Sequence, residues 1–109
     1  MRQAEVYRNN VFAGILTEND EQKYIFRYND KYFFDKKQPS ISLTLPKIQQ
    51  EYTSDLLFPF FFNMIAEGVN RQLQSAQLKI SENDDFGLLI ATSKYDTIGA
   101  ITLKIIDNL

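Results

Sequence analysis

Val6-Tyr7-Arg8-Asn9-Asn10-Val11-Phe12-Ala13-Gly14-Ile15-Leu16, near the N-terminus, predicts a β-hairpin and so sets the fold class. Two runs rich in apolar and aromatic residues flank Asn9-Asn10, and asparagine tolerates the positive φ angles of a tight hairpin turn. Gly14 interrupts the second run, which indicates a β-bulge or a close approach of another segment to the backbone. The chain is therefore expected to begin with two antiparallel strands.

Two further strands are predicted downstream of this hairpin. Lys23–Tyr28 carries aromatic residues at alternate positions, which would share one face of a strand. Ser40–Leu45 alternates polar and apolar residues over its whole length, and Pro46 then ends the pattern. Of the connecting segments, residues 29–37 are predicted to hold one helical turn and residues 47–52 to form a loop.

The middle of the chain predicts three helices. Thr53-Ser54-Asp55 supplies residues that commonly cap a helix, directly before the apolar run Leu56–Ala66. Gly68 stands where a C-terminal glycine is expected. Apolar residues at helical spacing over 69–80 predict a second helix, and residues 85–92, after a further capping sequence, predict a third.

Ile98–Ile106 is predicted to close the chain as a strand. The order is then a hairpin, two strands, three helices and a strand. Such segregation indicates an α+β fold, with a mostly antiparallel sheet of about five strands packed with two to three helices. We expect a single domain over residues 1–109, because a chain of 109 residues has room for one core.

Residue types that the chain lacks exclude several kinds of chemistry. There is no Cys, so thiol nucleophiles and thiolate metal sites are excluded, and no His, the commonest general base and transition-metal ligand. The 12 basic and 14 acidic residues are interspersed and give a net charge of −2. Direct nucleic-acid binding needs clustered positive charge and is not expected. The N-terminus lacks an apolar signal region and no stretch approaches membrane-spanning length, so no membrane association and a cytoplasmic location are expected.

Asp85-Phe86-Gly87 spells the metal-binding tripeptide of protein kinases, but other parts of a kinase are missing. Phosphotransfer also needs a Gly-rich loop and a catalytic His-Arg-Asp triplet, which a chain without His cannot contain. We therefore interpret the tripeptide as a helix N-terminus with Phe86 in the core. The acidic run 82–85 lacks the spacing of a calcium loop and suits a helix start. We predict no catalytic, cofactor or metal site.

The apolar run Leu56–Ala66 is the candidate for a partner-binding surface. As a helix at roughly 100° per residue, its large side chains would cover an arc of about 240°. Packing on one sheet needs a stripe only somewhat wider than about 100°. The surplus is covered either by the domain's own elements or by a partner protein, for which Phe58, Phe62 and Ile65 are the predicted contacts. Pro59 fits only in a first turn, so the helix should begin one or two residues before it.

Read in order, these segments resemble the N-terminal domain of the HipA family of toxin kinases. That domain has a Val-Gly-x-Leu strand, a Phe-x-Tyr strand, a Leu-Ser-Leu-Ser-Leu-Pro strand, a Phe-Phe-Asp-Asn-Leu-Leu-Pro-Glu-Gly helix, an Asp-x-Phe-x-Leu-Leu helix and a Gly-Ala-x-x-Leu strand. The counterparts here are Val6–Leu16, Phe26–Tyr28, Ile41–Pro46, Phe60–Gly68, Asp84–Leu89 and Gly99–Leu103. The resemblance covers essentially the whole chain, and six motifs in register are more specific than any one alone.

Three positions depart from the family pattern. Ala66 stands where the family has proline, and the family's glycine before the final aspartate is missing, since Tyr95 precedes Asp96. Phe62 replaces an acidic residue. This last change makes the predicted helix more apolar than the family pattern and favours an additional contact there.

The resemblance implies a non-catalytic role in a toxin–antitoxin system. In full-length members a Ser/Thr kinase core follows this domain and carries the catalytic residues, whereas this chain ends directly after its last predicted strand. In split systems the domain is a separate small protein that binds the kinase and can act as the antitoxin. The implied partners are a HipA-like Ser/Thr kinase toxin and, through the complex, a helix-turn-helix DNA-binding protein. The alternatives are a scaffold that couples the kinase to a DNA-binding repressor without inhibiting it, or an excised N-terminal domain of a full-length kinase.

We predict that the purified protein transfers no phosphate from ATP, because it lacks a Gly-rich loop and a His-Arg-Asp triplet. A radiolabelled-ATP assay should give no signal above background, and Asp85→Ala should leave that background unchanged. Phosphotransfer that survives repurification and disappears in Asp85→Ala would contradict this prediction.

Overall fold

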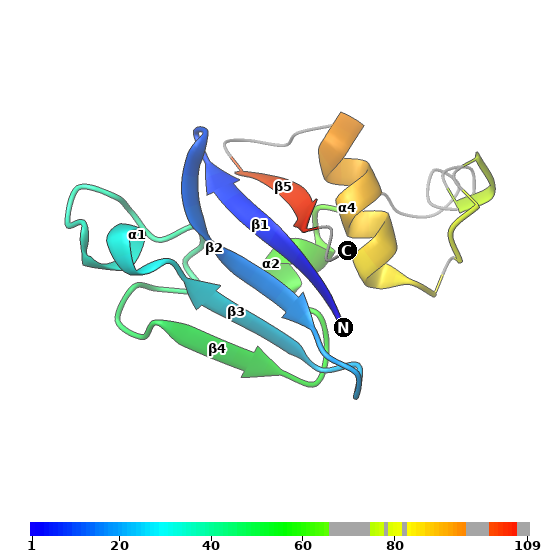
Figure 1. The fold of residues 1–109 in the computed structure, drawn as a ribbon, viewed down its shortest axis with the longest axis horizontal. Coiled ribbons are helices and arrows are strands. Elements are labelled where there is room, and N and C mark those ends of the chain that lie inside the picture. The colour runs from blue at the N-terminus through cyan, green and yellow to red at the C-terminus, as the bar shows by residue number, and fades with distance from the viewer. Residues whose placement is uncertain (66–74, 78, 82, 96–100, 107–109) are drawn as a thin grey trace.

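The computed structural model describes residues 1–65, 75–77, 79–81, 83–95 and 101–106. Within these residues, five strands form one antiparallel sheet with helices packed on one face (Figure 1). The elements are β1 Arg2–Arg8, β2 Val11–Glu18, β3 Tyr24–Tyr28, α1 Asp30–Phe34, β4 Glu51–Ser54, α2 Pro59–Phe62, α4 Asp85–Tyr95 and β5 Ile101–Ile106. The predicted α+β class and antiparallel sheet are confirmed.

The sheet has the strand order β4-β3-β2-β1-β5, so the last strand pairs with the first. β1 and β2 form the predicted hairpin, and Asn9 and Asn10 in its turn have positive φ angles of 48° and 65°. Asparagine enters this left-handed region more readily than most residues. The strand predicted over Lys23–Tyr28 is confirmed as β3. The closing strand is confirmed over Ile101–Ile106, and residues 98–100 lie outside the described part of the chain.

A β-bulge in β2 sets the register of the hairpin. Next to the turn Tyr7 pairs with Phe12, but one step further Val6 pairs with Gly14, so Ala13 is the extra residue. Beyond this point each residue of β1 faces a residue one position later in β2 than the turn alone would give. Because side chains alternate between the faces of a sheet, the shift decides which side chains of β2 lie on each face.

Gly14 also shows the predicted close approach. A β-carbon at this position would lie 2.3 Å from the carbonyl oxygen of Arg27 and 3.0 Å from the Cα of Tyr28, both in β3. Any side chain there would therefore force β2 and β3 apart. The glycine allows the bulge and the β2–β3 pairing to coexist.

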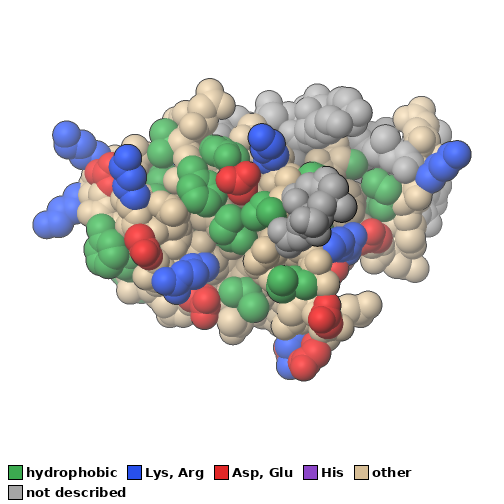
Figure 2. All heavy atoms as spheres, viewed as in Figure 1, with side chains coloured by type: hydrophobic (Ala, Val, Ile, Leu, Met, Phe, Trp, Pro, Cys, Tyr) green, Lys and Arg blue, Asp and Glu red, His purple; other side chains and the backbone are tan. Residues whose placement is uncertain are grey.

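Helices α2 and α4 cover one face of the sheet, and the core lies between them and the strands (Figure 1). Phe26 of β3 is fully buried, and its ring lies 4.9 Å from that of Tyr28 and 5.8 Å from that of Phe61 in α2. On α4, Phe86 and Leu89 are fully buried. Figure 2, drawn from the side that α2 and α4 leave uncovered, shows hydrophobic side chains dispersed among charged ones.

The apolar run that begins at Leu56 forms a much shorter helix than predicted. α2 covers only Pro59–Phe62, with Phe58 as its N-cap and Asn63 as its C-cap. Pro59 is the first residue of α2, which confirms its predicted position in the first turn. Proline suits this position because it has no N–H to donate inside a helix. The predicted helix over 56–66 is thus wrong in extent, and the wide apolar arc derived from it does not exist.

The predicted strand over Ser40–Leu45 is wrong, and the fourth strand is instead β4, Glu51–Ser54, which pairs with β3. The Ser42 Oγ accepts a hydrogen bond from the Thr44 amide at 3.2 Å and contacts its hydroxyl at 2.9 Å. Such local side-chain bonds stabilise a turn in place of a strand. Because the chain turns here, Leu43 is 99% exposed.

Tyrosine hydroxyls anchor the loop between α1 and β4. The Tyr28 hydroxyl accepts a hydrogen bond from the Ile41 amide at 3.0 Å and donates to the Leu45 carbonyl, while both apolar side chains are buried. Two further hydroxyls act in the same way. The Tyr32 hydroxyl donates a hydrogen bond to the Pro39 carbonyl at 2.6 Å, and the Tyr52 hydroxyl donates one to the Pro46 carbonyl at 2.5 Å. The loop is therefore built onto the sheet by side-chain-to-backbone bonds.

The remaining helix predictions have mixed outcomes. α1 confirms the helical turn predicted within 29–37, and α4 confirms the third helix, which runs on to Tyr95. Gly68 and most of the second predicted helix, 69–80, lie outside the described residues. Within this predicted helix, residues 75–77 are described and are helical. Within the part of the chain that the structure describes, no helix is long and apolar enough to cross a membrane.

We predict that Gly14→Ala lowers the free energy of unfolding by about 2 kcal/mol or more, because the added methyl group overlaps the backbone of β3. Urea unfolding followed by circular dichroism would measure this loss. Val11→Ala, at an exposed position of the same strand, is the control and should cost less than about 1 kcal/mol. Equal losses in the two variants would contradict the steric explanation.

Candidate partner-binding site

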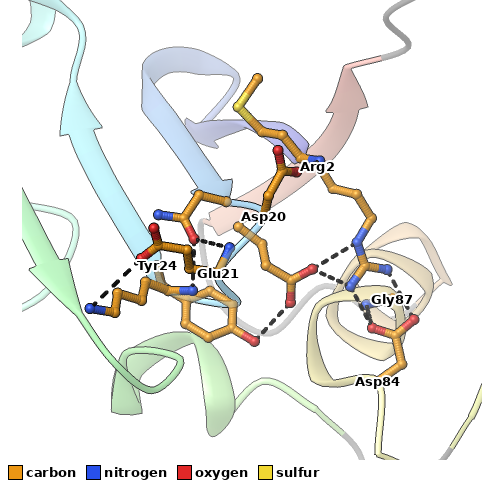
Figure 3. A network of polar contacts seen from close by, with 10 residues as sticks. Arg2, Asp20, Glu21, Tyr24, Asp84 and Gly87 are labelled. Atoms are coloured by element: carbon orange, nitrogen blue, oxygen red, sulfur yellow. Dashed lines mark hydrogen bonds and ion pairs between the residues drawn. The ribbon is translucent and has the colours of Figure 1, made fainter.

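Arg2 organises a polar cluster where one end of the sheet meets α4 (Figure 3). Its guanidinium donates two hydrogen bonds to the Asp84 carboxylate, from Nη1 to Oδ2 at 2.9 Å and from Nη2 to Oδ1 at 2.7 Å. Nε and Nη2 also donate to Glu18 Oε1, at 3.0 Å and 2.6 Å. The Tyr24 hydroxyl donates to the other oxygen of Glu18 at 2.9 Å. One arginine thus connects β1, β2 and, through Glu18, β3 to the start of α4.

The register of the sheet places three members of this cluster in a row. Glu18 pairs with Arg2 on one side and with Tyr24 on the other. Side chains of directly paired residues point to the same face. If Ala13 paired with Val6 instead of bulging, Thr17 would stand opposite Arg2, and Glu18 would point to the other face. The bulge in β2 is therefore a condition for the cluster.

Asp84 also caps α4. Its Oδ1 accepts a hydrogen bond from the Gly87 amide at 3.1 Å, and its carbonyl accepts from the Leu88 amide at 3.0 Å. This confirms the capping predicted before the third helix, where a negative charge is favourable. Phe86 is fully buried, and the Arg2 guanidinium lies 5.0 Å from the centre of its ring. The kinase-like tripeptide is a helix start with a core anchor, as predicted.

The close contacts shift the pKa values of Asp84, Tyr24 and Arg2. Hydrogen bonds from Arg2 lower the pKa of Asp84, although partial burial acts in the opposite direction. Burial, and then the hydrogen bond to Glu18, raise the pKa of Tyr24 well above its usual value, so the hydroxyl remains a donor. The hydrogen bond to Asp84 raises the already high pKa of Arg2. Near neutral pH, Asp84 is thus a carboxylate, Arg2 is a cation and Tyr24 is a neutral hydroxyl.

A groove of about 900 Å³ lies beside the cluster. The cluster forms its polar side, and residues around the start of α2 form its apolar side, namely Leu56, Leu57, Pro59 and Phe62. Leu56 is 77% exposed and Phe62 is 40% exposed. Exposed large apolar side chains beside a concave surface are typical of a binding site.

Of the three predicted interface residues, only Phe62 reaches the surface. Phe58 and Ile65 are buried in the domain's own core, and the Phe58 ring lies 6.3 Å from that of Phe61. The short helix explains this division, because its N-cap residue and Phe61 face inwards while Phe62 lines the groove. Phe58 and Ile65 are therefore not available to a partner in this fold, and the candidate surface becomes the groove around Phe62.

The sequence patterns do not reveal Arg2, Glu18 or Leu56 as parts of a site. Arg2 meets Glu18 only in the shifted register, and Gly14 is the one sequence signal for that shift. Leu56 falls inside the predicted helix. The signal for its exposure is Pro59, since residues before a first-turn proline precede the helix.

Comparison with known proteins gives concordant matches. Residues 4–104 match the family model described as the HipA N-terminal domain. An uncharacterized protein of Haemophilus influenzae is 29% identical over 104 residues, which cover 95% of this chain and 92% of that protein. A solved structure described as the N-terminal domain of HipA toxin superposes with a TM-score of 0.73 at 24% identity, over 100% of this chain and 96% of that chain. This structural likeness concerns the fold.

We predict that Asp84→Asn lowers the free energy of unfolding at pH 7 by about 1 kcal/mol, because the ion pair is lost while asparagine still caps α4. Asp84→Ala should cost roughly 1 kcal/mol more, since it also removes the cap. The lowered pKa of Asp84 means that its charge stabilises the fold above the unfolded pKa, and that this contribution disappears as the pH falls through the folded pKa. Asp84→Asn should therefore flatten the acid side of the stability profile.

Urea unfolding between roughly pH 7 and pH 2 would measure both effects. Asp20→Asn is the comparison: the terminal amino group also lowers the pKa of Asp20, but this ion pair is largely exposed, so its loss should change the profile less. A profile for Asp84→Asn that runs parallel to the wild-type profile down to low pH would rule out the proposed role of the charge.

Proposed function

Because the chain belongs to the HipA N-terminal domain family, we propose that it binds a separate HipA-like Ser/Thr kinase toxin and restrains its activity. The observation that carries this proposal is the groove beside α2, where Leu56 and Phe62 expose apolar surface. A side chain such as Phe62, half-exposed in the free protein, is the kind of anchor that becomes buried in a complex.

In this proposal the chain acts as a non-catalytic subunit. The family that it matches is an N-terminal domain rather than a kinase core, and the sequence contains neither His nor Cys. Its contribution would be a rigid surface. The groove is built on a sheet end, a proline-started helix and the Arg2 cluster, so little order has to be gained on binding.

The same proposal assigns DNA contact to another protein. With a net charge of −2 and dispersed basic residues, the sequence offers no cluster of positive charge for contact with phosphates. A helix-turn-helix protein would therefore meet it through the kinase complex. In the scaffold alternative, the chain couples the kinase to the DNA-binding protein without inhibiting it. Both proposals predict the same binding, and only a measurement of kinase activity distinguishes them.

We predict that Phe62→Asp leaves folding nearly intact and weakens the complex with the kinase by about 2 kcal/mol or more, since an aromatic anchor is lost and a charge is placed in the interface. Phe61→Asp should instead abolish folding, because Phe61 is fully buried. Paired thermal melts and pull-downs with the purified HipA-like kinase of the same organism would measure both effects.

A kinase assay with and without the protein completes this test. Restraint requires lower kinase activity with wild type and recovery of activity with Phe62→Asp. Binding with unchanged kinase activity would support a scaffold instead. If Phe62→Asp melts normally and still binds fully, the groove around Phe62 is not the contact surface.

A further inference from the structure

The groove carries an excess of negative charge next to its apolar rim. Among the described residues that line it, Glu18, Asp55, Asp84 and Asp85 are acidic, and Arg2 is the one basic residue. The Arg2 guanidinium is bonded to two of these carboxylates. Even with Lys23, which pairs with Asp55 from outside the lining, two positive charges face four negative charges, and the groove should have a negative potential.

Asp55 is the carboxylate best placed to meet a partner. Its side chain is 86% exposed, against 14% for Glu18 and 30% for Asp84. It has an ion pair with Lys23, whose Nζ lies 3.8 Å from its Oδ1 and is itself on an exposed side chain. An exposed pair at this distance contributes little and is readily exchanged for a better one.

An exposed apolar residue lines the same groove. Leu56 follows Asp55 in the chain, and its amide donates a hydrogen bond to the Ser54 Oγ at 3.2 Å. Ser54 ends β4 and Pro59 begins α2, so a strand and a helix hold both ends of this short segment. The charge and the apolar surface are therefore presented on one short segment that is anchored at both ends.

We infer that the groove binds a segment of the partner kinase in which a Lys or Arg stands beside a large apolar side chain. The cation pairs with Asp55, and the apolar side chain packs against Leu56 and Phe62. This inference rests on the proposed function and specifies the chemistry of the contact. Arginine suits the site best, since a guanidinium can bond a carboxylate with two parallel N–H groups.

The charge pattern disfavours other occupants. A nucleic acid would bring phosphates against the acidic wall. A second copy of this chain, docked groove to groove about a twofold axis, would place acidic walls against each other. A basic and apolar protein segment satisfies both sides of the groove.

The test compares two charge reversals, one at Asp55, directly after β4, and one at Glu51, where β4 begins. Asp55→Lys should weaken binding of the purified kinase about ten-fold or more near 0.15 M salt, and Asp55→Asn should weaken it less. Glu51→Lys changes the net charge equally, but Glu51 begins β4 and does not line the groove. Its effect should stay within about two-fold, as expected for a charge remote from an interface. Thermal melts verify that all three variants fold.

The outcomes separate this inference from the proposed function. If wild type does not bind the kinase, both fail. If wild type binds and Phe62→Asp disrupts the complex, but Asp55→Lys behaves like Glu51→Lys, only the basic-segment inference is overturned. Restoration of Asp55→Lys binding by one Lys→Glu or Arg→Glu change in the kinase would establish the pairing.

Discussion

The bulge at Ala13 in β2 is the constraint on which the rest of the molecule depends. This one residue moves the β1–β2 pairing by a single position, and Gly14 beside it keeps β3 within hydrogen-bonding distance. As a result Leu16 lies on the covered face in the core, and Glu18 stands in a row with Arg2 and Tyr24. In a hairpin without the bulge, the side chains of Leu16 and Glu18 would point to the opposite face of the sheet.

The candidate site combines that register with a second local constraint, the proline at the start of α2. Arg2 bonds Glu18 in the sheet and Asp84 at the N-terminus of α4, so the sheet end and the helix are held together. Pro59 stops the helix from extending towards the N-terminus, which leaves Leu56 outside it and exposed. The polar side of the groove thus depends on the strand register and its apolar side on the proline, and the two sides lie at the same end of the sheet.

Local signals predict much of this fold, and the failures have a common physical origin. Asn9-Asn10, the aromatic alternation of β3 and the cap before α4 act within a few residues, and the structure confirms each of them. The segment around Ser42 alternates like a strand, but its hydroxyl groups bond the local backbone and the edge of β3 is taken by β4. Hydrophobic periodicity does not show whether a segment pairs as a strand or forms local hydrogen bonds while another segment takes its place in the sheet. The Arg2 cluster joins residues that lie up to 82 positions apart in the sequence, so no local pattern could reveal it.

The position of β1 between β2 and β5 also has a consequence for synthesis on the ribosome. β1 is made first among the strands and β5 last, so one edge of β1 stays unpaired while the residues between them are added, on the order of ten seconds at typical elongation rates. An unpaired strand edge invites pairing with other chains, and charged side chains on the strand oppose it. β1 carries Arg2, Glu5 and Arg8. These charged residues lie on an inner strand of the finished sheet, and during synthesis they would disfavour pairing of β1 with other chains before β5 is made.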